Sequence, residues 1–246
     1  MKKTGIIISI VAGLSIVLSS LILGISFYNT KGHEKSIYVV GLAEKDFISD
    51  LIVWDVSLNV VKMDLKEAYS EIKSQNAAIK EYLISKGIKE DEMVFEPIST
   101  RKDYRYEWDN KISRNIQYFN GYSLTQTIAI KSKEVEKIEK ITREVSELLD
   151  KGMQLNVNSP EYYYTKLADL KIEMLANAAK DARKRAETVA ANAGAKLGRL
   201  KRANMGVFQI TAPNSSEEDY SWGGAFNTSS KEKRASINMR LTYKVK

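Results

Sequence analysis

The residues best suited to binding chemistry lie in two stretches that interrupt the regular pattern of the chain. Residues 101–119 interleave tyrosines and a tryptophan with arginines and lysines, and residues 213–233 contain an acidic triplet and a further tryptophan. Aromatic rings and guanidinium groups can stack on sugars or anchor a protein interface. We expect both stretches to be long connections, with an ordinary hairpin loop as the alternative for 101–119. The candidate partner-binding residues are Tyr104, Arg105, Tyr106, Trp108 and Trp222.

No motif for catalysis or cofactor binding accompanies these residues. The sequence has no cysteine, which excludes disulfides, thiol nucleophiles and cysteine-based metal sites. It has a single histidine, His33. Gly223-Gly224 fits neither a phosphate loop nor a dinucleotide loop, and the triplet Glu217-Glu218-Asp219 lacks the spaced ligands of a calcium loop. We therefore predict no catalytic residue, no cofactor and no metal. A hydrolase whose carboxylates converge only in three dimensions stays open.

The N-terminus reads as a membrane-inserting export segment. Lys2 and Lys3 precede an uncharged run, and fourteen of residues 5–28 are Ile, Leu, Val or Phe. Twenty-four helical residues span roughly 36 Å, at about 1.5 Å per residue, which is enough to cross a bilayer. A cleaved signal peptide is the alternative, because Gly24-Ile25-Ser26 is a small-x-small triplet. Residues 1–28 are thus predicted to be an anchor or signal segment, and 29–36 a tether.

Both alternatives place the remaining chain on the non-cytoplasmic side of a membrane. The domain is then either held in the cell envelope by the anchor or released, after cleavage near Ser26, as a periplasmic or secreted protein. Without residues 1–35 the chain has 34 basic and 30 acidic residues, a net charge of +4 that reads as a mild excess spread along the sequence. That excess is only weak evidence for nucleic-acid binding. Because the domain is expected to be exported, we expect no nucleic acid as a partner.

Hydrophobic periodicity predicts two tandem strand–helix–strand units. In the first, a strand at Ile52–Val60 leads into a helix capped by Asp64 and ended at Gly87, with Ile88 packing back as in a Schellman motif. A return strand follows at 93–98. The second unit has a strand at 122–130, one helix over 133–151 and a return strand at 153–157.

A third and longer helix is expected to begin at Ser159-Pro160 and to end at Gly194. Its small residues imply close packing against a sheet or a neighbouring helix. The last strands are expected at 205–210 and 236–245. The fold class is therefore α+β over residues 37–246, with a long C-terminal Ala-rich helix on antiparallel sheet. The buried stripe of that helix is predicted to contain Leu167, Leu170, Met174, Ala178, Ala182, Ala186 and Val189.

The third helix and its exit also carry a family signature. Leu167-Ala168-Asp169-Leu170-Lys171 leads into residues 178–187, Ala-Ala-Lys-Asp-Ala-Arg-Lys-Arg-Ala-Glu, and then into Gly194-Ala195-Lys196-Leu197-Gly198. This order resembles the SIMPL-domain family of bacterial envelope proteins, which includes periplasmic and outer-membrane immunogens. Strands at Val40-Gly41 and Gly121-Tyr122 fit the same order, so the resemblance covers about residues 36–246. It implies an exported domain, ring-shaped oligomers for some members, and no established catalytic residues.

The leading hypothesis is therefore an exported, membrane-tethered, non-enzymatic protein that self-assembles or scaffolds in the envelope. Its expected partners are further copies of the chain, the membrane, and an envelope protein or glycan. The alternative is a module that binds an envelope ligand through the aromatic and basic loop 101–119 or through loop 213–233. A carboxylate-dependent hydrolase is the third reading.

Overall fold

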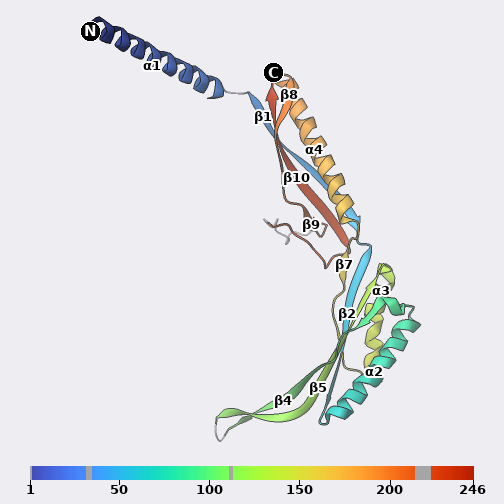
Figure 1. Ribbon diagram of the computed structural model, residues 1–246. Coiled ribbons are helices and arrows are strands. Elements are labelled where there is room, and N and C mark those ends of the chain that lie inside the picture. The colour runs from blue at the N-terminus through green and yellow to red at the C-terminus, as the bar shows by residue number, and fades with distance from the viewer. Residues whose placement is uncertain (1, 32–34, 111–112, 214–222) are drawn as a thin grey trace. The chain divides into compact units, whose positions relative to one another are not determined.

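The chain folds into two compact units that are each built from separate parts of the sequence (Figure 1). The computed structural model describes residues 2–31, 35–110, 113–213 and 223–246. Unit 1 comprises Met1–Ala43, Leu175–Gly206 and Ile237–Lys246, and unit 2 comprises Glu44–Met174 and Val207–Ser236. Helices and antiparallel sheets occur together in the chain, which confirms the predicted α+β class.

Unit 2 is centred on one long antiparallel strand pair. Strand β2 (Leu51–Lys62) runs beside β5 (Arg114–Ser132), from Ile52↔Ser132 to Lys62↔Tyr122. Strand β3 (Met93–Phe95) pairs with β5, and β6 (Leu155–Val157) pairs with β2, which gives the order β3-β5-β2-β6. The two predicted strand–helix–strand units are present and interlock, because the return strand of each pairs with the first strand of the other.

Two helices line the core of unit 2, α2 (Leu65–Ser85) and α3 (Val135–Glu144). A 3-10 helix, η2 (Val145–Lys151), continues α3, so the single helix predicted over 133–151 is wrong in its last part. Residues three apart eclipse in a 3-10 helix, which keeps Val145 and Leu148 buried together. Large, fully buried side chains of this core include Ile52, Trp54, Leu58, Ile79, Leu83, Ile128, Ile130 and Ile138.

The predicted ends of α2 are confirmed. The Asp64 carboxylate accepts hydrogen bonds from the backbone N–H groups of Lys66 and Glu67, at 2.8 and 3.0 Å. Gly87 has φ +88°, and the Ile88 N–H donates to the Leu83 carbonyl at 3.0 Å, as in a Schellman motif. The Ile88 side chain is buried, so the cap also contributes to the core.

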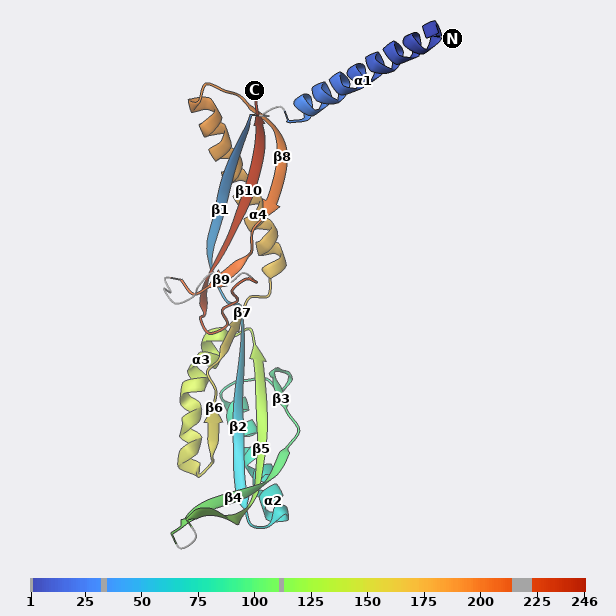
Figure 2. The ribbon, with the colours of Figure 1, turned by 90° about the vertical axis from the view of Figure 1, so that its left-hand side faces the viewer.

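Unit 1 is a two-layer arrangement of one sheet and one helix (Figure 2). Its strands belong to β1 (Ser36–Ile48), β10 (Glu232–Val245) and β8 (Leu197–Met205), in the order β1-β10-β8. Helix α4 (Leu167–Asn192) packs its alanines against this sheet. The buried cluster contains Val39, Ala182, Ala186, Leu241 and Tyr243.

The contact between β1 and α4 is unusually close at Gly41. A Cβ atom built on Gly41 would lie 2.2 Å from the Ala178 carbonyl oxygen and 2.4 Å from the Ala182 nitrogen. In the next residue the Leu42 N–H donates to the Asp181 carboxylate at 2.9 Å, and Asp181 also pairs with Arg185 at 2.8 Å. The small residues predicted to permit close packing therefore meet a strand, at a position where only glycine fits.

Three sequence predictions are corrected around α4 and its neighbours. The helix begins at Leu167 rather than at Ser159-Pro160, because β7 (Glu161–Tyr163) pairs with β2 and buries Tyr162. Val189 is 49% exposed, and Ala190, four residues beyond Ala186, takes its place in the buried stripe. The strand predicted at 205–210 is divided between the end of β8 and β9 (Gln209–Thr211).

The predicted anchor lies in α1 (Lys2–Lys31), where side chains are described for residues 11 and 13–27. The large apolar side chains of that stretch are exposed, including Leu14, Ile22 and Phe27. Within the described part of the chain, no helix combines the length and the apolar character that a membrane crossing needs. His33, in the predicted tether, lies outside the described residues.

Replacing Gly41 by alanine is expected to destabilise unit 1. The added methyl group meets the backbone of α4, which cannot move aside as a flexible side chain would, so the cost should be about 3 kcal/mol, the upper end for overpacking. Thermal unfolding followed by circular dichroism measures it. Val40→Ala, on the exposed side of the same strand, is the control and should cost far less. A Gly41→Ala protein as stable as the Val40→Ala protein would contradict this packing.

Candidate functional site

Four of the five residues predicted to bind a partner lie on a two-stranded β-arm. Strand β4 (Ser99–Asp109) pairs with β5 from Ser99↔Thr125 to Asp109↔Arg114, with a bulge after Asp103. We call residues 104–119 the arm, described here apart from 111–112. The stretch 101–119 is thus strand on both sides of residues 110–113, and its prediction as a long connection is wrong. Alternating aromatic residues suit a strand in which successive side chains point to opposite faces.

One face of the arm is aromatic. Tyr104, Tyr106 and Trp108 alternate along β4 and therefore share a face, with exposed fractions of 38, 63 and 59%. Phe119 lies directly across from Tyr104, with the two ring centroids 5.9 Å apart in an edge-on arrangement. Phe119 also meets the ring of Tyr122 at 5.4 Å. The result is a row of aromatic side chains that the described residues leave open to solvent.

The opposite face of the arm is polar and satisfied locally. The Arg105 guanidinium lies 3.1 Å from the Glu107 carboxylate and 5.9 Å from the centroid of the Tyr118 ring, over which it is placed. Tyr118 is the cross-strand neighbour of Arg105. Exposed pairs of this kind contribute little stability, about 0–1 kcal/mol. This face therefore resembles an ordinary solvated surface, and the aromatic face does not.

The structure brings together three of the five predicted binding residues, Tyr104, Tyr106 and Trp108. Arg105 lies on the other face of the same strand, and Trp222 lies outside the described residues. Phe119 completes the aromatic face and was absent from the predicted set. Its position could have been found by pairing the two strands, since the 104↔119 register places it beside Tyr104.

The second predicted connection, 213–233, is mostly irregular where it is described, but it is hydrogen-bonded to β9. Ala225 donates its N–H to the Gln209 side chain, and the Asn227 N–H donates to the Ile210 carbonyl at 3.0 Å. The Lys233 side chain is buried and its ammonium donates to the Asn227 carbonyl at 2.5 Å. Residues 223–233 thus form an ordered turn against β9, and the acidic triplet at 217–219 lies outside the described residues.

The carboxyl groups with altered acidity all have a lowered pKa. The pKa of Asp46 is held down by its hydrogen bond with Arg234. For Glu92 burial acts to raise the pKa, but hydrogen bonds from Ser132 and from the Lys89 N–H outweigh it. The pKa of Glu144 is lowered chiefly by its hydrogen bond with Lys86. A general acid needs the opposite shift, so none of these three groups fits that role.

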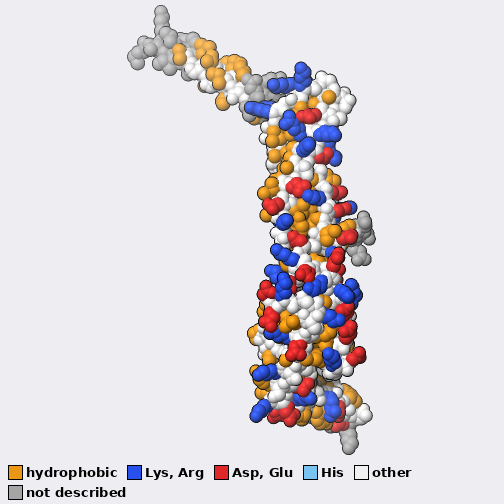
Figure 3. Space-filling view, turned by 90° about the vertical axis from the view of Figure 1, so that its right-hand side faces the viewer, with side chains coloured by type: hydrophobic (Ala, Val, Ile, Leu, Met, Phe, Trp, Pro, Cys, Tyr) orange, Lys and Arg blue, Asp and Glu red, His pale blue; other side chains and the backbone are white. Residues whose placement is uncertain are grey.

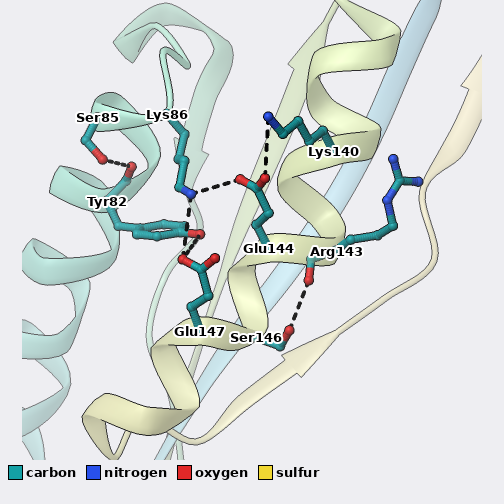
Figure 4. Close-up of polar contacts among 8 residues, drawn as sticks. All are labelled: Tyr82, Ser85, Lys86, Lys140, Arg143, Glu144, Ser146 and Glu147. Carbon is teal, nitrogen blue, oxygen red and sulfur yellow. Dashed lines mark hydrogen bonds and ion pairs between the residues drawn. The ribbon is translucent and has the colours of Figure 1, made fainter.

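Lys86 is the centre of a polar cluster that joins α2 to the α3–η2 segment (Figure 4). Its ammonium lies 2.8 Å from Glu144 and 3.6 Å from Glu147, and Glu147 also accepts a hydrogen bond from the Tyr82 hydroxyl at 3.3 Å. The hydrogen bond with Glu144 raises the pKa of Lys86 well above its usual value. Since each charged group is already paired, the cluster reads as a clamp between helices and not as a reactive site.

Comparison with protein families agrees with the signature found on the third helix. The family model SIMPL, described as a protein of unknown function (DUF541), matches residues 37–243. The match spans most of the chain, and the protein belongs to the SIMPL family. A comparison with curated proteins finds no match.

The clamp predicts a pH dependence of stability. The folded-state pKa of Glu144 lies below its usual 4.5, so its contribution is present above that value and is lost as the pH falls through the folded pKa. Lys86→Met should therefore lower the melting temperature at neutral pH, and its difference from wild type should close in acid. Lys140→Met is the control, because Lys140 is more exposed and lies 3.6 Å from Glu144. A difference unchanged in acid would contradict the pairing.

Proposed function

We propose that this SIMPL protein is an exported, membrane-tethered and non-enzymatic assembly protein, and that its arm docks against the arm of a second copy. The observation that supports this most is the aromatic face of the arm. Exposed fractions of 63% for Tyr106 and 59% for Trp108 are high for side chains that usually anchor interfaces. A two-stranded hairpin is at best marginally stable alone in water, so a partner on this face would also stabilise the arm.

A second copy is the occupant that this face fits best. The face carries aromatic side chains from both strands and no charged side chain, because the Arg105–Glu107 ion pair lies on the opposite face. Two identical aromatic faces related by a two-fold axis can bury one another without leaving a charge unpaired. Within the described residues β4 pairs with β5 alone, so the main-chain groups of its other edge could add to such a contact. The family resemblance also suggests self-association, although a ring would need a head-to-tail contact in addition to this two-fold one.

Export and tethering are supported by the N-terminal sequence. The uncharged, apolar run follows two lysines and precedes the domain matched by the family, and the chain lacks cysteine. A non-enzymatic role is supported by the absence of a catalytic motif in the sequence, and the lowered pKa values make Asp46, Glu92 and Glu144 unsuitable as general acids. The alternative is capture of an envelope ligand such as a glycan, with the ligand stacked on Tyr106 and Trp108.

The assembly is tested by replacing Tyr106 and Trp108 together with threonine, which keeps strand propensity and removes both rings. The full-length protein in detergent micelles should form an oligomer of defined mass, measured by light scattering or sedimentation. The double variant should weaken self-association at least a hundredfold, since buried aromatic anchors typically contribute about 2 kcal/mol or more each.

The matched control replaces Arg105 and Glu107, on the opposite face of the same strand, with threonine. This control should keep the wild-type mass, which separates loss of the aromatic face from loss of the arm. A monomeric wild-type protein, or a Tyr106→Thr/Trp108→Thr variant with unchanged mass, would overturn the assembly proposal. If the Tyr106→Thr/Trp108→Thr variant has the same oligomeric mass as the wild type but no longer binds envelope glycans, the ligand-binding alternative is favoured.

A further inference from the structure

The excess of positive charge is concentrated in unit 1. From residue 35 onward this unit contains twelve Lys and Arg residues and two acidic residues, a net charge of +10, whereas unit 2 has 23 basic and 28 acidic residues, a net charge of −5. The small positive net charge of the whole sequence is therefore the sum of a large positive charge on unit 1 and a smaller negative charge on unit 2. The basic residues of unit 1 are Lys35, Lys180, Arg183, Lys184, Arg185, Lys196, Arg199, Lys201, Arg202, Arg240, Lys244 and Lys246.

The two acidic side chains of unit 1 are already engaged by arginines of the same helix. Glu187 lies 2.8 Å from Arg183, and Asp181 lies 2.8 Å from Arg185 and also accepts the Leu42 N–H. From residue 35 onward the unit's sequence supplies no further Asp or Glu that could pair with Arg202 on β8 and Arg240 on β10. The positive charge of these two arginines is therefore not neutralised by carboxylate side chains of this part of the unit.

Several of these basic residues lie on the sheet face that points away from α4. Leu241 and Tyr243 pack against α4, so Arg240 and Thr242, which alternate with them, point to the opposite face. Arg202 lies across from Thr242 in the antiparallel register and shares that face. We call this side of the unit-1 sheet the open face.

The open face also carries an apolar row. On β1, Val39, Gly41 and Ala43 are buried on the side of α4. Tyr38, Val40 and Leu42 alternate with them and are exposed by 60, 38 and 44%. Basic residues on β8 and β10 thus share one face with exposed apolar side chains on β1. Figure 3 views the chain from the other side, where α4 covers the sheet, and lysines, arginines and hydrophobic side chains are mixed with acidic ones there.

We infer that the open face of unit 1 binds the anionic headgroups of the membrane to which the chain is tethered. Surfaces of this kind combine cations for lipid phosphates with apolar and tyrosine side chains for the headgroup boundary. The inference rests on the proposed tethering. If α1 is inserted, the five residue steps from Lys31 to Ser36 limit the start of β1 to roughly 18 Å from the helix end, at about 3.6 Å per residue. The tether is therefore short enough for the open face to reach the headgroups, and its cations are attracted to anionic lipid once they lie within a Debye length, about 8 Å at physiological salt.

A membrane fits the open face better than a second copy does. The acidic unit of another copy would satisfy the cations but would not account for the apolar row beside them. Zwitterionic lipid would accommodate that row without satisfying the cations. Only an anionic lipid surface uses both, so binding should depend on lipid charge and should weaken with added salt.

The absence of native cysteine allows a direct test on the full-length chain. A fluorophore is attached to Val40→Cys on the open face, or to Val189→Cys on the exposed side of α4 as a control. The protein is reconstituted in vesicles of phosphatidylcholine alone, or of phosphatidylcholine mixed with phosphatidylglycerol, each containing a nitroxide-labelled lipid as quencher. Position 40 should be quenched strongly in the mixed vesicles and weakly in phosphatidylcholine, salt should reverse the difference, and position 189 should respond in neither.

Matched charge variants locate the effect. Arg202→Gln with Arg240→Gln removes two charges from the open face, and Lys180→Gln with Lys184→Gln removes two from α4. Two lost lipid contacts should shift the docked-to-undocked ratio about thirtyfold for the arginine variant, and little for the lysine variant. Three results would overturn the inference. Position 40 could be quenched equally in both vesicle types, or it could not be quenched at all. It could also be protected without being quenched, which would indicate contact with a second copy.

Flotation of the same samples separates this inference from the proposed tether. A chain that floats with phosphatidylcholine vesicles while position 40 is not quenched in mixed vesicles retains its tether and loses the open-face contact. A chain that floats only with the mixed vesicles, and is quenched there at position 40, loses the tether and keeps the contact.

Discussion

The close approach of β1 to α4 at Gly41 is the contact on which the organisation of unit 1 depends. No side chain separates the strand from the helix backbone there, and the neighbouring Leu42 amide is bound by the Asp181 carboxylate. Residues near 41 and near 181 are distant in the sequence, so the contact closes a long chain segment. Asp181 and the alanines of the family signature thereby acquire a structural role, which is to seat the first strand of the domain.

The packing of β1 against α4 also determines which side chains lie on the open face of the unit-1 sheet. Because Val39, Gly41 and Ala43 face the helix, alternation places Tyr38, Val40 and Leu42 on the opposite side, beside Arg202 and Arg240. A shift of β1 by one residue would turn the apolar row toward α4 and would bring Val40 against a helix backbone that accepts only glycine. The composition of the open face is thus a consequence of the packing constraint beneath it.

Sequence patterns predicted those parts of the fold that rest on local chemistry. The cap at Asp64, the Schellman motif at Gly87 and the two strand–helix–strand units depend on neighbouring residues, and each is present. The aromatic residues of the arm were recognised, but their strand character was not, because exposed aromatics interleaved with charges show no buried face. The β7 strand was missed for a related reason, since only its pairing with β2 overrides the helix-start signal of Ser159-Pro160.

The charge division was beyond sequence analysis for a different physical reason. Unit 1 is assembled from three separated segments, so its positive charge is diluted along the sequence by acidic residues that belong to unit 2. Only the fold collects the cations in one body. The two units then differ in character: unit 1 is basic and follows the apolar N-terminal helix, and unit 2 is acidic and carries the aromatic arm. Such a division suits a protein that contacts a membrane through one unit and other copies through the other.

Native-state hydrogen exchange on the full-length protein tests the packing at the centre of this account most directly. Amides of β1 from 37 to 43, of α4 from 175 to 192 and of β10 from 237 to 245 should exchange with one common opening free energy, because none of these segments buries its apolar face without the other two. The Leu42 amide should be among the protected ones. Exchange of the β1 amides well before those of α4, or an unprotected Leu42 amide, would contradict the account.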